Sequence, residues 1–320
     1  MMILAGLAFL LATFQTVADP GDPVFGQGDR IAIVGNTFAE RMQLDGQFES
    51  LLHAAHPGHR LSIRNFGWSG DEVSLQPRPL NFIGMKEWLS NHETDVIIAC
   101  FGMNESYSGD DGLDGFSRDL DAWITTQRAN TYNGSTPPRI ILVSPIAHED
   151  LGEPLPDGVE HNFILQRYVD AMRRAAVSHD LVFIDLFTPT REAMDRGEGP
   201  LTINGIHPNA SGYRLAACSM AEQLDLLGRL GNDSSDGDAV QDQESQAAVR
   251  RAVLAKNQLF FQRWRPVNTE YVYGRRHEPY GSQNFPDEMK KLDELVSEAD
   301  QVIWSLPPGD VTCEIQEEDY

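Results

Sequence analysis

Four short stretches of the sequence carry the residue types that acyl transfer needs. They are Gly35-Asn36-Thr37, Ser69-Gly70-Asp71, Gly102-Met103-Asn104-Glu105 and Asn204-Gly205-Ile206-His207. A hydroxyl can attack an acyl carbon and a histidine can take its proton, while glycine N–H groups and an amide side chain can stabilise the resulting oxyanion. The four stretches therefore predict an acyl-transfer site if the fold brings them together.

The elements that must position these stretches alternate between strand and helix. Nearly continuous apolar runs, as in parallel strands buried on both faces, occur at 31–34, 61–66, 96–101, 140–144 and 181–185. Helical patterns lie at 39–56, 79–91, 116–129, 161–179 and about 210–230. This order predicts a three-layer α/β/α, flavodoxin-like fold with a sheet of about five parallel strands.

The first three stretches follow predicted strands, and open α/β sheets place their sites at the carboxyl ends of strands. Thr37 would also begin a helix, where unpaired N–H groups favour negative charge. Capping alone would explain Asn36 and Thr37 equally well. A nucleotide site is disfavoured, because residues 35–40 contain one glycine and place Glu40 near any phosphate.

On these motifs the chain resembles the SGNH hydrolases of the GDSL esterase/lipase type, over about residues 29–230. The resemblance implies that Thr37 is the nucleophile and His207 the base. It also implies that Gly70 and Asn104 donate to the oxyanion. No metal or cofactor is implied, and the expected substrate is an acylated carbohydrate or another small ester.

The departures from the family pattern leave two functions open. Thr37 replaces a serine, and its β-methyl group restricts χ1 and crowds the approach. Asn36 and Asn204 each replace an aspartate; the aspartate at the second position orients the histidine. The corresponding change in a serine-protease triad lowers the rate about ten-thousandfold. The domain is either a hydrolase with a modified triad or a module that binds a glycan or acyl ester without turnover.

Another carboxylate would have to replace the missing one if the triad is to be complete. Glu105, Asp71 and Glu278 are the candidates that the sequence offers. His148-Glu149-Asp150 has ligand residue types but no partner at zinc spacing, so we predict no metal site there.

The C-terminal quarter has a different composition. Residues 231–245 are predicted to be an acidic linker and residues 246–320 an extension that could cap the cleft. Aromatic and arginine residues cluster between Phe260 and Tyr280. Arg275, His277 and Glu278 would line the cleft, unless the cluster only attaches the extension to the main domain. Asn36 and Glu105 of the main domain are also expected to line the cleft. An amphipathic helix is predicted at 286–304, with a buried stripe of Leu292, Leu295, Val296, Ala299, Val302 and Ile303.

The net charge limits the classes of partner that are expected, and the N-terminal residues predict the location of the protein. A formal net charge of -23 disfavours nucleic acid and anionic membranes as partners. The apolar start predicts a signal peptide over 1–18, and hence a secreted or periplasmic protein. The run is shorter than the ~20 residues of a spanning helix, so no stable membrane insertion is expected after cleavage. The three cysteines give no even disulfide set and identify no compartment; Cys100 is expected in the core.

Overall fold

A computed structural model of the chain describes residues 24–227, 239–266, 269–307 and 313. The predicted signal peptide and residues 231–238 of the predicted linker lie outside the described residues. The sheet has five parallel strands in the order β2-β1-β3-β4-β5, which confirms the predicted fold class. The strands are β1 (Arg30–Gly35), β2 (Ser62–Asn65), β3 (Val96–Cys100), β4 (Arg139–Val143) and β5 (Val182–Ile184).

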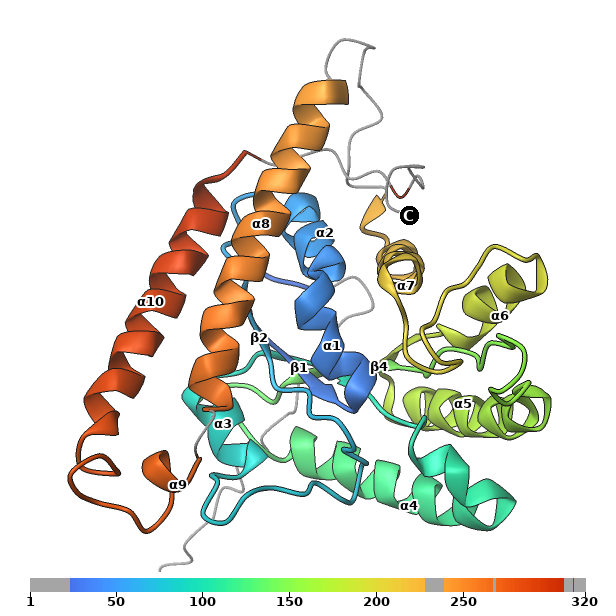
Figure 1. The fold of residues 1–320 in the computed structure, drawn as a ribbon, viewed down its shortest axis with the longest axis horizontal. Coiled ribbons are helices and arrows are strands. Elements are labelled where there is room, and N and C mark those ends of the chain that lie inside the picture. The colour runs from blue at the N-terminus through green and yellow to red at the C-terminus, as the bar shows by residue number, and fades with distance from the viewer. Residues whose placement is uncertain (1–23, 228–238, 267–268, 308–312, 314–320) are drawn as a thin grey trace, which may run out of the picture.

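Helices cover both faces of the sheet (Figure 1). Alternate residues of β1 point to opposite sides, so Ile31 and Ile33 belong to one core and Ala32 and Val34 to the other. The first core contains α1 (Thr37–Asp45), α2 (Gln47–Ala55), α6 (Phe187–Asp195) and α7 (Ala210–Gln223). The second contains α3 (Met85–Asn91), α4 (Gly109–Arg128) and most of the apolar face of α5 (Val159–His179).

The predicted helix at 39–56 is two helices, because the chain breaks at Gly46. This residue has φ +71° and ends α1 through an N–H bond to the Met42 carbonyl. A Cβ at Gly46 would lie 3.1–3.2 Å from Leu254 and Val253, so a close contact with the C-terminal extension also requires glycine here. The predicted helix at 79–91 is confined to α3, and α6 was not predicted.

The C-terminal extension is built into the core. Its helices are α8 (Ala239–Trp264), α9 (Thr269–Val272) and α10 (Phe285–Ser305). Figure 1 shows α8 and α10 side by side along the β2 edge of the molecule. Trp264 packs edge-on against Phe66, Trp68 and Trp88, with ring centroids 5.1–5.7 Å apart. Residues 239–245, which we predicted to be linker, instead form the start of α8.

The predicted amphipathic helix corresponds to α10. Val296 and Ile303 of the predicted stripe are buried, but Val302 is 53% exposed. Asp300 is buried in its place, because Arg64 of β2 reaches it with two guanidinium nitrogens, at 3.1 and 2.5 Å. An ion pair therefore fixes the C-terminal half of α10 to the sheet.

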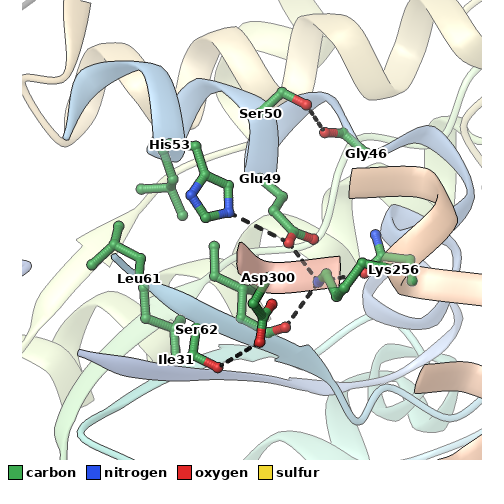
Figure 2. Close-up of polar contacts among 12 residues, drawn as sticks. Ile31, Gly46, Glu49, Ser50, His53, Leu61, Ser62, Lys256 and Asp300 are labelled. Carbon is green, nitrogen blue, oxygen red and sulfur yellow. Dashed lines mark hydrogen bonds and ion pairs between the residues drawn. The ribbon is translucent and has the colours of Figure 1, made fainter. Parts of the chain in front are cut away.

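A second buried ion pair joins α8 to α2 (Figure 2). Lys256 is 1% exposed, and its ammonium lies 2.5 Å from Glu49 Oε1 and donates to the Ile63 carbonyl at 2.9 Å. Burial opposes the charge on Glu49, but Lys256 and His53 outweigh it and lower the pKa of Glu49 to about 2. A buried charge that loses its partner is strongly destabilising, so this pair ties the extension to the main domain.

The cysteines depart from the prediction of no disulfide framework. Cys218 of α7 and Cys313 form a disulfide whose Cα atoms are 5.7 Å apart. Cys100 is buried and free, as expected of a core residue, and burial raises its pKa to about 12. Among the described residues, no helix is both long enough and apolar enough to span a bilayer.

Replacing Lys256 tests whether the extension is a structural part of the main domain. Lys256→Met leaves Glu49 buried without its cation, so the free energy of unfolding should fall by about 3–5 kcal/mol, measured in urea. Lys291→Met is the matched control, because Lys291 is an exposed lysine of α10. Equal stabilities of the two variants would contradict this role for the pair.

Candidate active site

Three of the four predicted stretches meet at one small pocket at the carboxyl ends of the strands. The pocket has a volume of about 30 Å³, and Thr37, Asn104 and His207 all line it. Its other lining residues are mostly apolar: Asn36, Phe38, Cys100, Phe101, Met103, Ser144, Pro145, Ile146 and Ile206. The fold thus brings together the proposed nucleophile, base and amide donor.

Thr37 is positioned by the sharp end of β1. Gly35 has φ +128°, and a Cβ there would lie 2.0 Å from the Cys100 carbonyl oxygen. The ends of β1 and β3 can therefore lie this close only because residue 35 is a glycine. Asn36 then caps α1 by accepting a hydrogen bond from Phe38 N at 3.0 Å. Among the described residues, the Thr37 hydroxyl has no hydrogen-bond partner, which leaves it free for a ligand.

The loop after β2 lies directly against α1. A Cβ at Gly67 would be 2.3 Å from Glu40 N, and Asn65 fixes the loop by donating to the Ala39 carbonyl at 2.7 Å. Gly70 is exposed with φ +85°, and its N–H is unpaired within the described part of the chain. Gly70 does not line the pocket, although its neighbour Asp71 contacts Asn104.

Asn104 retains a free donor. It gives one amide N–H to the Asp71 carbonyl at 3.1 Å, and its second N–H remains for a ligand. Glu105 is buried and accepts hydrogen bonds from Val73 N at 2.9 Å and Gly102 N at 2.8 Å. Burial raises the pKa of Glu105 to about 7, against the opposing effect of these N–H groups. Glu105 therefore joins two loops. We predicted that it would line the cleft, but it is not among the residues that line the pocket.

Asn204 fixes the tautomer of His207. Its Oδ1 accepts from His207 N at 3.1 Å and lies 3.0 Å from His207 Nδ1. The backbone N–H can only donate, so the amide must present its oxygen, and the nearby Nδ1 must carry the imidazole proton. Nε2 is then the basic nitrogen. An asparagine at this position therefore still selects the tautomer that a base at Nε2 requires.

Within the described residues, no carboxylate contacts His207. Asp71 forms two hydrogen bonds of 2.6 Å with Arg78, and Glu278 is exposed beyond α9. Burial, with a smaller contribution from Arg41, lowers the pKa of His207. The histidine is consequently neutral and able to accept a proton at neutral pH, but no negative charge stabilises its protonated form.

The predicted cleft residues of the extension lie elsewhere. Arg275 approaches Glu270 at 3.7 Å, His277 contacts Ser282 at 2.6 Å, and neither these two residues nor Glu278 lines the pocket. Arg265 of the same cluster instead reaches Glu40 of α1 at 2.6 Å. The composition of the cluster predicted a role at the cleft but could not indicate which arginine reaches α1.

Glu149, for which no positioning role was predicted from the sequence, holds the segment before Asn204. Its carboxylate accepts from Leu201 N at 2.8 Å and from Thr202 N and Oγ1 at 2.7 and 2.6 Å. It thus holds the segment that leads to Asn204. The polar run His148-Glu149-Asp150 after β4 was the available signal. The described residues contain no cluster of three or more His, Cys, Asp or Glu that could hold a metal ion.

Comparison with known proteins agrees with this architecture. Residues 27–215 match the model of the GDSL-like lipase/acylhydrolase family. The structure of a gut microbial diltiazem-metabolizing enzyme matches with 12% identity and a TM-score of 0.58, over 87% of this chain and 96% of that one. The structure of a candidate GDSL-like lipase from Parabacteroides merdae matches with 17% identity and a TM-score of 0.51, over 64% of this chain and 100% of that one.

An acetylxylan esterase from Geobacillus stearothermophilus matches with 17% identity and a TM-score of 0.49, over 62% of this chain and 95% of that one. No curated protein matches the sequence. At these identities the solved structures support the fold alone.

Restoring the carboxylate tests the roles assigned to Asn204 and His207. Asn204→Asp should raise kcat/KM for an ester, by up to about ten-thousandfold, because aspartate stabilises the imidazolium. The carboxylate also favours the protonated form and raises the pKa of His207, so the acid limb of the pH–rate profile should move to higher pH. Asn284→Asp, a change of the same charge at an exposed residue before α10, is the control. An unmoved acid limb would contradict the assignment.

Proposed function

Because the chain belongs to the GDSL-like lipase/acylhydrolase family, we propose that it is an ester hydrolase that forms an acyl-enzyme, with a small acylated carbohydrate ester as its substrate. The observation that carries this proposal is the double contact of Asn204 Oδ1 with His207, which leaves Nε2 as a base. That base lines the same pocket as the free Thr37 hydroxyl.

The reaction uses each residue in turn. The Thr37 hydroxyl attacks the acyl carbon while His207 Nε2 takes its proton, and Asn104 and Gly70 donate to the developing oxyanion. Collapse of the tetrahedral intermediate breaks the ester bond, and His207 protonates the leaving alcohol. Water, activated by the same nitrogen, then attacks the acyl-threonine and releases the acid and the free hydroxyl.

We expect this hydrolysis to be slow compared with that of a full triad. The neutral amide of Asn204 orients the imidazole but provides no charge opposite the imidazolium. The β-methyl group of Thr37 further restricts the approach of its hydroxyl. Amide and glycine donors still stabilise the oxyanion, and each such donor contributes about a hundred- to a thousandfold in rate.

The size of the pocket favours a short acyl group. Its volume is only about 30 Å³, and the apolar side chains of Met103, Ile146 and Ile206 line it. An acetyl methyl group suits such an apolar recess, whereas a long chain would have to lie outside it. This supports acetyl esters over lipids as substrates.

A binding function without turnover is the second candidate. The observation in its favour is that, in the described part of the chain, Arg41 is the charged group that acts on His207, with no carboxylate in contact. A cation beside the imidazole disfavours its protonation and thus opposes general-base catalysis. In this case the pocket would retain an acyl ester without cleaving it.

We further propose that the protein functions outside the cytoplasm. The disulfide between Cys218 and Cys313 supports an oxidising compartment, since such bonds are rare where thiols are kept reduced. The apolar N-terminal stretch, with small residues at 16–18, supports the same secreted or periplasmic location.

Hydrolysis of p-nitrophenyl acetate and acetylated xylan tests the proposed activity. Thr37→Ala should abolish turnover, because it removes the attacking oxygen, and His207→Ala should abolish it by removing the base. Thr37→Ser should equal or exceed the wild type, since it keeps the hydroxyl and removes the crowding methyl group.

His277→Ala and Thr126→Ala are the matched controls, because both residues lie outside the pocket. Equal rates in Thr37→Ala and the wild type would exclude the acyl-threonine. Binding of the ester with no hydrolysis in the wild type would favour the second candidate function.

A further inference from the structure

An arginine of the C-terminal extension reaches the helix that carries the nucleophile. Arg265, directly after α8, places Nη1 2.6 Å from Glu40 Oε1. The two side chains are 23% and 17% exposed, so water screens this pair less than a surface ion pair. Glu40 lies three residues after Thr37 on α1, and the contact therefore joins the extension to the start of the site.

The other carboxylate oxygen of Glu40 continues this connection. Oε2 accepts hydrogen bonds from both the backbone N–H and the hydroxyl of Ser69. Ser69 immediately precedes Gly70, the proposed oxyanion donor. A continuous chain of polar contacts thus runs from Arg265 through Glu40 to the residue beside Gly70.

Arg265 also acts on the same loop through an aromatic ring. Its guanidinium lies 3.8 Å from the ring centroid of Trp68, within the range of a cation–π contact. Arg78 lies over the same ring at 4.4 Å and pairs with Asp71. Guanidinium groups therefore contact both ends of this turn, Trp68 and Asp71.

Gly70 itself has little to fix its orientation. It is exposed, has φ +85°, and has no other atom within 4 Å of the position a Cβ would take. The direction of its N–H therefore depends on the residues on either side. Asp71 is tied to the site through Asn104, whereas Trp68 and Ser69 depend on Arg265 and Glu40.

We propose that Arg265 is a positioning residue, through which the C-terminal extension orients the Gly70 N–H toward the oxyanion. This rests on the proposed hydrolase function and extends it, because part of the catalytic geometry would come from outside the segment that matches the family model. Arg265 touches neither substrate nor reacting atoms in this scheme.

The test compares two arginines of the same extension. Arg265→Gln should lower kcat for p-nitrophenyl acetate by about tenfold or more with little change in KM, since a lost oxyanion donor lowers kcat about a hundred- to a thousandfold. Arg265→Lys should recover part of this rate, because lysine keeps the charge but lacks the planar fork. Arg263→Gln is the control: Arg263 pairs with Asp293 of α10 and lies over Trp88.

Hydrogen exchange of residues 66–73 provides a readout that does not depend on activity. Ser69 N–H is bonded to Glu40, and Asp71 N–H to the Trp68 carbonyl at 2.9 Å. Both amides should exchange faster in Arg265→Gln than in the wild type and in Arg263→Gln. If Arg265→Gln does not fold, Arg265→Lys provides both readouts.

Unchanged kcat and unchanged exchange in a folded Arg265 variant would overturn the proposal. Equally accelerated exchange in the Arg263 and Arg265 variants would also overturn it, because the effect would then be general loosening of the extension. If the wild type hydrolyses no ester, the proposed function fails. Faster hydrogen exchange in Arg265→Gln but not in Arg263→Gln would then still support the claim that Arg265 positions the loop. Equal exchange in both variants would still refute that claim.

Discussion

The amide oxygen of Asn204 is the group on which the chemistry of the site depends. It faces His207 because the backbone N–H of that residue requires an acceptor, and it therefore receives the Nδ1 proton as well. An uncharged residue thus provides the orientation that an aspartate provides in a full triad. It does not provide the charge that would stabilise the imidazolium. In the proposed mechanism His207 is therefore an oriented base that lacks the stabilisation a carboxylate would provide.

The rest of the fold positions the loops that carry the other proposed site residues. Gly35 and Gly67 allow β3 and the loop after β2 to approach the start of α1 more closely than any side chain would permit. Glu105 and Glu149 hold neighbouring loops through backbone N–H groups. Buried ion pairs at Glu49 and Asp300 attach the extension, whose Trp264 completes an aromatic core with β2. The extension is therefore part of the structure that supports the site.

The fold could be predicted from the sequence because its strands are apolar runs separated by helical patterns. The same order of elements predicted where the four motif stretches lie relative to the sheet. The gathering of Thr37, Asn104 and His207 at one pocket was predictable for the same reason. The tautomer was not, since it depends on a backbone N–H that composition cannot orient. Nor was the choice of Arg265 over Arg275, because composition does not show which of the two reaches α1. The Cys218–Cys313 bond joins residues 95 positions apart, a separation that carries no local signal.

The most direct measurement is the nitrogen NMR spectrum of the His207 ring, assigned by comparison with His207→Ala and followed against pH. Our account predicts a neutral imidazole at pH 7 with the proton on Nδ1 and an unprotonated Nε2. It also predicts a titration below the ordinary histidine pKa of about 6.5. A proton on Nε2 at pH 7, or a titration above that value, would contradict the claim that Asn204 prepares His207 to act as a base.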